Sequence, residues 1–262
     1  MKTLKDLYPD YNEDWNFYFS KIDGEEVSIV TDFNLSIVAP VKEFPICVTI
    51  KIEFNKTLDD KLHTHTVNIY NSIEDEIDDR FSKSCNFIKA GAVTYSDKKY
   101  YVYYFAEESG IIDILDSIFE KYDKDYEVAI DKEPNWDRFF DTLEPDCYER
   151  EEVYNRKLID YLKFQNDNGQ TPREVNFWLY FSNEEGRTSF IKSLDSLNSG
   201  NDDFKVKYTL ETDEELPYGV VISRFMKLRQ NEIDEISHLL ITIAVENGGE
   251  FDGWESELRS NK

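Results

Sequence analysis

The sequence has few cysteines, and it lacks a long apolar run. Its cysteines, Cys47, Cys85 and Cys147, are odd in number and widely spaced, which argues against a disulfide framework and is typical of reduced thiols in the cytoplasm. Residues 1–7 lack the apolar segment of a secretion signal. The longest apolar run, at 239–245, is far shorter than the ~18 residues that a membrane helix needs. We therefore expect a cytoplasmic protein that does not span a membrane.

Basic residues are scarce beside acidic ones. The chain of 262 residues has 30 Lys and Arg against 55 Asp and Glu, a formal net charge of −25. Such an excess repels nucleic-acid phosphates and anionic lipids, and it favours a basic region of a protein as the partner. Because 40% of the residues are hydrophobic and 15% aromatic, the chain is nevertheless expected to fold.

Common catalytic motifs are absent as well. The sequence contains no nucleophile elbow, phosphate loop or metalloprotease helix motif. His63 and His65 could share one face of an extended segment, as a metal site sometimes requires, but no cysteine or third histidine is near them. His238 has no nucleophile that can be named beside it. We therefore expect no catalytic residue, no metal and no cofactor, and we interpret the three histidines as structural or exposed.

The first half of the chain has the pattern of an α+β domain. Residues 15–32 predict a β-hairpin around the turn dipeptide Asp23-Gly24. After it, the apolar periods predict elements in the order β-α-β-β-α-β, the ferredoxin-like order. They are a strand at 46–54, an exposed loop at 55–66, a helix from Ser72, strands at 90–96 and 99–105, a helix from Ile111 and a strand at 126–131.

The second half repeats this order. A short helical piece at 134–143 ends at Pro145, and a helix follows at 149–166, so we place the domain boundary between residues 146 and 147. The later elements are strands at 175–181, 204–210, 220–228 and 248–255, with helices from 182 and through 233–243. The predicted fold is α+β, with two tandem ferredoxin-like domains, 1–146 and 147–262, the first of which has an extra N-terminal hairpin.

Residues 248–255 end the second domain with an unusual pattern. Two glycines at 248–249 are a helix stop, and Asp252-Gly253 is a turn or bulge signal between Phe251 and Trp254. Trp254 has two interpretations. It can be a core residue, for which burial of about 150–250 Å² contributes about 4–6 kcal/mol at most. Alternatively, it can be an anchor for a partner, with a charged rim around it.

The C-terminal half resembles the family of regulators of ribonuclease E activity, B type. The similarity lies in 249–255 (GEFDGWE), 172–175 (PREV), Tyr180-Phe181, Arg187 and Phe190. At Asn176 the sequence departs from the family, in which His is frequent. The resemblance implies an acidic inhibitory protein that binds ribonuclease E and restrains RNA cleavage.

The N-terminal half resembles an uncharacterised bacterial domain that is often fused in front of this family. The similarity lies in Trp15, Tyr18, 22–24, Trp136, Phe140 and 143–145. Together the two resemblances cover most of the chain.

We expect an acidic, non-catalytic regulator that binds a basic region of a protein, with ribonuclease E or another RNA-processing protein as first candidate. The predicted partner-binding residues are Phe251, Asp252, Gly253, Trp254, Glu255 and Arg173, and Arg173 is expected to pair with Asp252. One alternative is a hydrolase whose acidic residues line a cleft between the domains. Another is a nuclease inhibitor that mimics nucleic-acid charge.

Two further surfaces have open interpretations. The aromatic residues of 100–105 could stack RNA bases, but we favour a strand with one face under the helices and the other forming an amphipathic sheet surface. The acid runs 74–79 and 213–215 are expected to be solvated faces, with a rim that steers a basic partner as the alternative.

Overall fold

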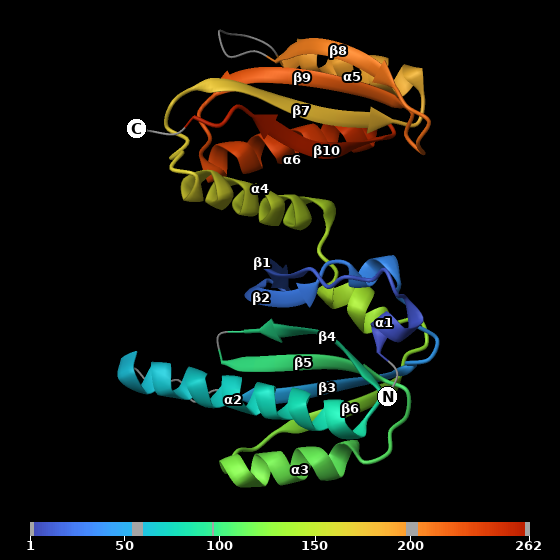
Figure 1. The fold of residues 1–262 in the computed structure, drawn as a ribbon, viewed down its shortest axis with the longest axis vertical. Helices are drawn as coiled ribbons and strands as arrows, with labels where there is room; N and C mark the ends of the chain where they lie inside the picture. The colour runs from blue at the N-terminus through green and yellow to red at the C-terminus, as the bar shows by residue number, and fades with distance from the viewer. Residues whose placement is uncertain (1–2, 54–59, 96, 198–203, 260–262) are drawn as a thin grey trace. The chain divides into compact units, whose positions relative to one another are not determined.

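The computed structural model describes residues 3–53, 60–95, 97–197 and 204–259, and it describes only the backbone at 60–68. The chain divides into two compact units, Met1–Pro145 and Asp146–Lys262, one residue before the predicted boundary. Each unit contains one antiparallel sheet with helices (Figure 1). The prediction of a mixed α+β chain is therefore confirmed.

Unit 1 has a six-stranded sheet in the order β1-β2-β4-β5-β3-β6. The hairpin forms as predicted around Asp23 and Gly24, and it extends the sheet beside β4. The strands are β1 (Trp15–Ile22), β2 (Glu25–Asp32), β3 (Ile46–Glu53), β4 (Phe87–Thr94), β5 (Lys98–Phe105) and β6 (Glu127–Lys132). The helical segments are α1 (Leu4–Leu7), η1 (Leu35–Ile37), α2 (Asp60–Ser84), α3 (Ile111–Tyr122) and η2 (Phe139–Leu143).

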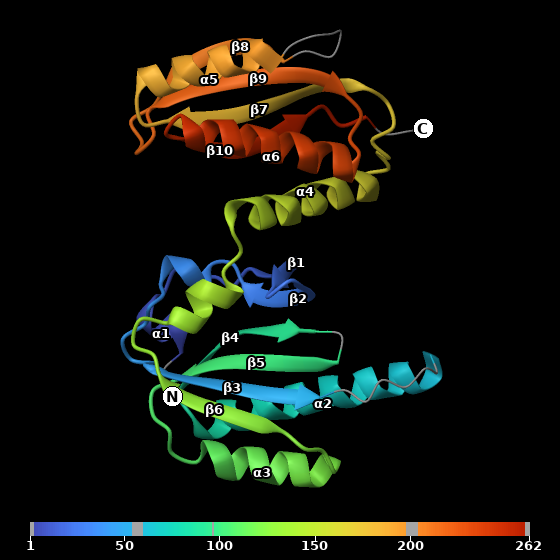
Figure 2. The ribbon, with the colours of Figure 1, turned by 180° about the vertical axis from the view of Figure 1, so that it is seen from behind.

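Both faces of strand β5 are covered, so the predicted amphipathic sheet surface at 100–105 is wrong. Helices α2 and α3 lie on one side of the sheet (Figures 1 and 2). On the other side, Tyr104 stacks on Trp136, with ring centroids 3.9 Å apart. Tyr101, Tyr103, Tyr104 and Phe105 are each 0% exposed. Because β5 is a central strand, its aromatic side chains form core on both faces and cannot stack RNA bases.

Helix α2 is longer than predicted, because it begins at Asp60 and replaces most of the expected loop at 55–66. The sequence from 60 to 71 has a weak apolar period but contains neither Gly nor Pro, so nothing in it stops a helix. Residues 55–59 of the expected loop, and residue 54 of the strand expected before it, lie outside the described residues. The extended segment proposed for His63 and His65 is helical in its backbone, and their side chains also lie outside the described part.

Unit 2 has the element order βαββαβ behind a leading helix. Its sheet has the order β10-β7-β9-β8, and α5 and α6 lie on one side of it (Figures 1 and 2). The elements are α4 (Cys147–Phe164), β7 (Arg173–Phe181), α5 (Glu184–Leu197), β8 (Lys205–Glu211), β9 (Tyr218–Met226), α6 (Gln230–Glu246) and β10 (Gly249–Ser256).

Local signals explain where the helices of unit 2 begin and end. Asp146 and Glu149 form a capping box at the start of α4, with Asp146 Oδ1 accepting from the Glu149 amide at 2.8 Å. Gly248 follows α6 with a φ of 70°, the left-handed conformation that glycine adopts without a steric penalty. The predicted helix stop therefore positions β10 for pairing with β7.

Candidate functional site

Strand β10 contains the predicted bulge. Phe251 pairs with Leu179 and Gly253 with Trp178, so Asp252 is the extra residue on this strand. Gly253 has a φ of 129°, which favours glycine. Asp252 is exposed, whereas Phe251 packs against the core of unit 2. The bulge therefore brings a carboxylate to the surface between two inward-facing aromatic residues.

Trp254 is a core residue, 8% exposed. Its Nε1 donates to Asn155 Oδ1 of α4 at 2.6 Å. Asn155, itself 1% exposed, donates from Nδ2 to Asp234 Oδ1 at 2.9 Å and to Ser237 Oγ at 3.3 Å on α6. Trp254 thus connects β10 to α4 and α6. This agrees with the first of the two interpretations from the sequence, that Trp254 is a core residue. A contact between Trp254 and a partner stays a prediction.

Arg173 is fully buried and pairs with Asp167, so the expected pair with Asp252 is wrong. The two terminal nitrogens of the Arg173 guanidinium, Nη1 and Nη2, both donate to the Asp167 carboxylate, and the Nη2 to Oδ1 distance is 2.8 Å. Nη1 also donates to the Glu257 carbonyl, at 2.9 Å. The Arg173 hydrogen bonds hold the pKa of Asp167 well below its usual range. The pair anchors the segment after β10 to the start of β7.

Three carboxylates gather where α4, α6 and β10 meet. Burial, together with the negative charges of Asp234 and Asp252, raises the pKa of Glu151 to about 8. Gln230 Nε2 donates to both oxygens of Asp234, at 2.9 Å each. Because its pKa lies above 7, the Glu151 carboxyl holds a proton at neutral pH. Sequence reasoning missed this group because α4 and β10 are about a hundred residues apart.

His238 has structural neighbours. Its Nε2 lies 3.1 Å from Glu152 Oε1 without a hydrogen bond to it, and its ring meets Tyr148 edge to face at 5.2 Å. Over the described residues, no three His, Cys, Asp or Glu side chains are grouped so that they could hold a metal ion. None of the described helices is long and apolar enough to cross a membrane.

The outer sheet face of unit 2, opposite α5 and α6, carries an aromatic surface. Cross-strand partners share a face, and the pairing links Trp178 through Val221 to Tyr208 across three strands. The rings of Trp178 and Tyr208 meet edge to face at 6.1 Å, and Tyr208 and Phe225 are 47% and 57% exposed. We define the outer sheet face by Trp178, Tyr180, Tyr208 and Phe225.

The sequence analysis did not predict the outer sheet face, although the aromatic residues of β7 indicate it. Strand β7 has aromatic residues at both parities, with Phe177 and Phe181 directed inward and Trp178 and Tyr180 outward. An acidic edge of three exposed residues lies beside this face on β10: Glu250, Asp252 and Glu255. Glu255 accepts from Asn176 Nδ2 at 3.2 Å. Aromatic residues with a charged rim are typical of protein interfaces.

The two acid runs have different surroundings. In unit 1, Lys89 bridges Glu74 and Asp78 at 2.8 and 2.6 Å, and Lys121 pairs with Glu76 at 2.5 Å, so this run is largely neutralised within the unit. In unit 2, residues 213–215 are exposed.

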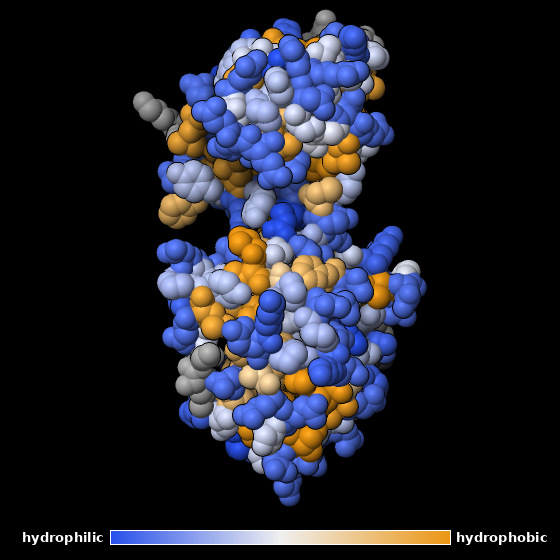
Figure 3. Space-filling model, turned by 90° about the vertical axis from the view of Figure 1, so that its right-hand side faces the viewer, coloured by the Kyte–Doolittle hydropathy of each residue, from blue (hydrophilic) through white to orange (hydrophobic). Residues whose placement is uncertain are grey.

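Hydrophilic residues predominate on the face that Figure 3 shows, and hydrophobic residues gather there in smaller groups.

Comparison with known proteins identifies both halves of the chain. Residues 13–144 match the model of a family of unknown function (DUF695), and residues 152–256 match that of Regulator of ribonuclease activity B (RraB). None of the curated proteins matches the chain. A crystal structure of an unknown protein from Galdieria sulphuraria is similar at 10% identity over 79% of this chain and 95% of that one. Its TM-score of 0.21 supports no further argument.

Proposed function

Because the chain belongs to the family of unknown function DUF695 and its residues 152–256 match Regulator of ribonuclease activity B, we propose that it is a non-catalytic regulator of a ribonuclease. The match of unit 2 is the observation on which this proposal rests. Ribonuclease E is the first candidate for the partner, and inhibition is the expected effect. The alternative of a hydrolase with an acidic cleft between the units stays a prediction.

The proposed topology of both units is ferredoxin-like. In unit 2 the strand order β10-β7-β9-β8 corresponds to fourth, first, third and second along the chain, with every neighbouring pair antiparallel. In unit 1 the order β6-β3-β5-β4 has the same sequence of positions, and the hairpin extends it beyond β4. These orders support the split βαβ arrangement.

The proposed contact surface is the outer sheet face together with the acidic edge. Its aromatic side chains offer apolar area, while Glu250, Asp252 and Glu255 attract a basic segment and guide its approach. The sequence also predicted four partner-binding residues that would support this surface from within the unit: Phe251, Gly253, Trp254 and Arg173. Trp254 and Arg173 are buried in unit 2, so they would act by holding β10 and its bulge in place.

The test measures binding of the full chain to ribonuclease E from the same organism, together with the rate of RNA cleavage. The wild type is expected to bind and to slow cleavage, more strongly at low salt because the attraction is partly electrostatic. Phe225→Ser and Glu255→Lys should each weaken binding about tenfold, a loss of about 1.4 kcal/mol. Phe225 and Glu255 are exposed, so both variants are expected to fold.

Matched controls lie away from the outer sheet face. Phe164→Ser changes an aromatic residue of α4 that is 80% exposed, and Asp195→Lys reverses an exposed charge on α5. Both should bind as the wild type does. If ribonuclease E is neither bound nor slowed, the proposed partner is wrong. If all four variants behave alike, the surface is wrong, and competition by RNA alone would favour the charge-mimic alternative.

A further inference from the structure

Strand β1 forms an open edge of the sheet in unit 1. It pairs with β2 over eight residues without a register shift, and it is the last strand in the sheet order. Among the described strands, only β2 pairs with it. Natural sheets usually protect such an edge with prolines, bulges or several charges. Residues 15–22 contain no proline and a single charged residue, Lys21.

The hairpin turn sets the direction of the backbone groups on this edge. Asp23 and Gly24 both have positive φ, 53° and 83°, as a two-residue type I′ turn requires. The flanking pair, Ile22 and Glu25, is then a hydrogen-bonded pair, and alternation along the ladder makes Lys21 and Phe19 non-hydrogen-bonded positions. Their amide and carbonyl groups point away from β2, toward the place of an additional strand.

An aromatic row accompanies the edge. Trp15, Phe17 and Phe19 lie on one face of β1 and are 37%, 46% and 68% exposed. The rings of Phe17 and Phe19 meet edge to face at 6.0 Å, and Val30, opposite Phe17 on β2, is 39% exposed. Exposed apolar residues in one continuous group indicate an interaction site.

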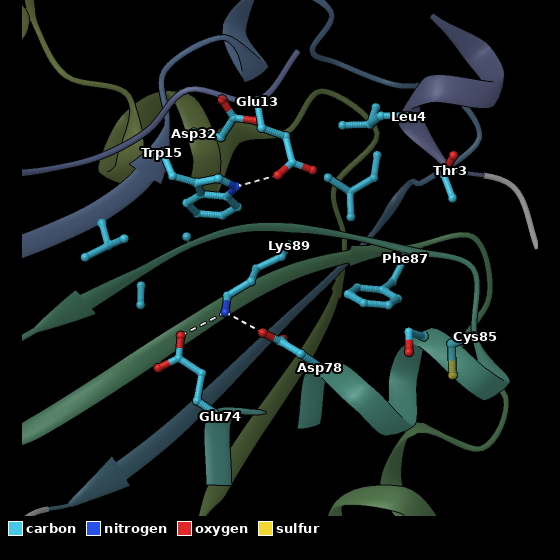
Figure 4. A pocket seen from close by; sticks show the side chains of 15 residues that line it. Thr3, Leu4, Glu13, Trp15, Asp32, Glu74, Asp78, Cys85, Phe87 and Lys89 are labelled. Atoms are coloured by element: carbon cyan, nitrogen blue, oxygen red, sulfur yellow. Dashed lines mark hydrogen bonds and ion pairs between the residues drawn. The ribbon is translucent and has the colours of Figure 1, made fainter. Parts of the chain in front are cut away.

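An acidic groove adjoins this row (Figure 4). It has a volume of about 650 Å³ and lies beside Trp15, with lining residues from β1, β2, β4 and α2. Trp15 Nε1 donates to Glu13 Oε2 at 2.9 Å. Lys89 Nζ donates to two carboxylates of α2, so its charge is already neutralised. The charged residues of the lining are Glu13, Asp32, Glu74, Asp78 and Lys89. Lys99 Nζ also donates to Glu74, at 2.6 Å, so four carboxylates stand against two lysines and the groove keeps a net charge of −2.

We propose that β1 and the acidic groove bind an extended segment of another protein in which apolar residues and a basic residue alternate with small polar ones. The segment adds a seventh strand to the sheet. Because alternate side chains share a face, its apolar residues lie against the aromatic row and its basic residue lies beside Glu13 at the Trp15 end of the groove. A second copy of this chain fits less well. Residues 13–32 contain six acidic residues and one lysine, so two hairpins edge to edge would repel each other. This site is in unit 1 and does not depend on the regulator function proposed for unit 2.

The test titrates the full chain with a blocked heptapeptide, Lys-Ser-Val-Ser-Val-Ser-Lys, whose lysines and valines share one face of a strand (the lysine–valine peptide). Binding should slow amide hydrogen exchange in residues 15–22 and leave β10 unchanged. The same peptide with glutamate in place of both lysines should not bind. The lysine–valine peptide with N-methyl groups on alternate residues keeps its charge but loses the donors for strand pairing, and it should also fail to bind. Protection elsewhere in the chain, or equal binding of the methylated peptide, would overturn the proposal.

Lys21→Pro separates strand addition from simple charge attraction. Proline removes an amide that points outward, so the β1–β2 ladder keeps its bonds while the added strand loses one. We expect affinity for the lysine–valine peptide to fall about threefold to tenfold. If charge alone governed binding, removal of Lys21 would increase the affinity instead. Phe19→Ser should weaken binding too, and Phe164→Ser, on α4 of unit 2, should not.

Discussion

Replacing Glu151 by glutamine should stabilise unit 2 at alkaline pH. Burial and the nearby charges of Asp234 and Asp252 raise the pKa of Glu151 from its ordinary 4.5 to about 8. Between these two values the folded protein keeps a proton that the unfolded chain has released. The free energy of unfolding therefore falls as the pH rises from about 4.5 to about 8, and it levels off above that. Glutamine has no proton to release, so the variant escapes this loss.

The magnitude follows from the pKa difference. Each pKa unit corresponds to about 1.4 kcal/mol, which makes the full cost of ionising Glu151 about 4–5 kcal/mol. Since Glu151 is partly exposed, water screens some of this, and we expect Glu151→Gln to gain about 2–4 kcal/mol at pH 9. At pH 4 both side chains are neutral and the two proteins should be equally stable.

The assay follows urea unfolding at pH 4, 7 and 9 by pulsed hydrogen exchange, which resolves peptides of unit 2 even if the two units unfold separately. Glu235→Gln is the matched control, because it makes the same substitution at an exposed carboxylate on α6. A carbon-13 titration of the Glu151 carboxyl measures its pKa directly. The reasoning fails if that carboxyl titrates near 4.5, or if Glu151→Gln has the same effect at pH 4 and pH 9.

Two further predictions concern the ends of β7 and β10. Arg173→Met leaves the Asp167 carboxylate buried without a cation and should destabilise unit 2 by about 3–5 kcal/mol. Because the pKa of Asp167 is lowered in the folded protein, the stabilisation by this pair is present above pH 3.8 and is lost as the pH falls below it. A double-mutant cycle with Asp167→Leu checks this, because additive effects would contradict it. Gly253→Ala should cost about 1–3 kcal/mol from its φ of 129° alone, since no atom lies within 4 Å of an added Cβ. Gly249→Ala should cost more, because its Cβ would lie 2.3 Å from Phe181 Cδ1, and equal melting temperatures of the two alanine variants would refute this order.

Several features of this protein could be predicted from local sequence alone. The hairpin at Asp23-Gly24, the helix stop at Gly248 and the bulge at Asp252-Gly253 all follow from residues that are adjacent in the chain. Turn dipeptides and apolar periods report the conformation of a few neighbouring residues, so they identify elements and their order. The weak apolar period before Ser72 predicted a loop at 55–66, although 60–71 contains neither Gly nor Pro and α2 begins at Asp60.

The environment of single side chains depended on contacts between distant segments. From the sequence we expected Arg173 to pair with Asp252, but the turn before β7 brings Asp167 next to Arg173 instead. Trp254 had two interpretations in the sequence, and its hydrogen bond to Asn155 of α4 identifies it as a core residue. The aromatic residues of β5 were expected at a surface because their burial depends on Trp136 and helix α2, which no local pattern relates to them.

The sequence by itself determined the acidic charge, the order of the elements and the positions of their turns. Only the tertiary structure decided which acids are neutralised and which are not. Lys89 reaches Glu74 and Asp78 from the neighbouring strand β4, whereas Glu151 meets Asp234 and Asp252 from two distant elements. The physical reason is that pKa and burial depend on charges and atoms within a few ångströms in space, and the fold brings these together from positions up to a hundred residues apart.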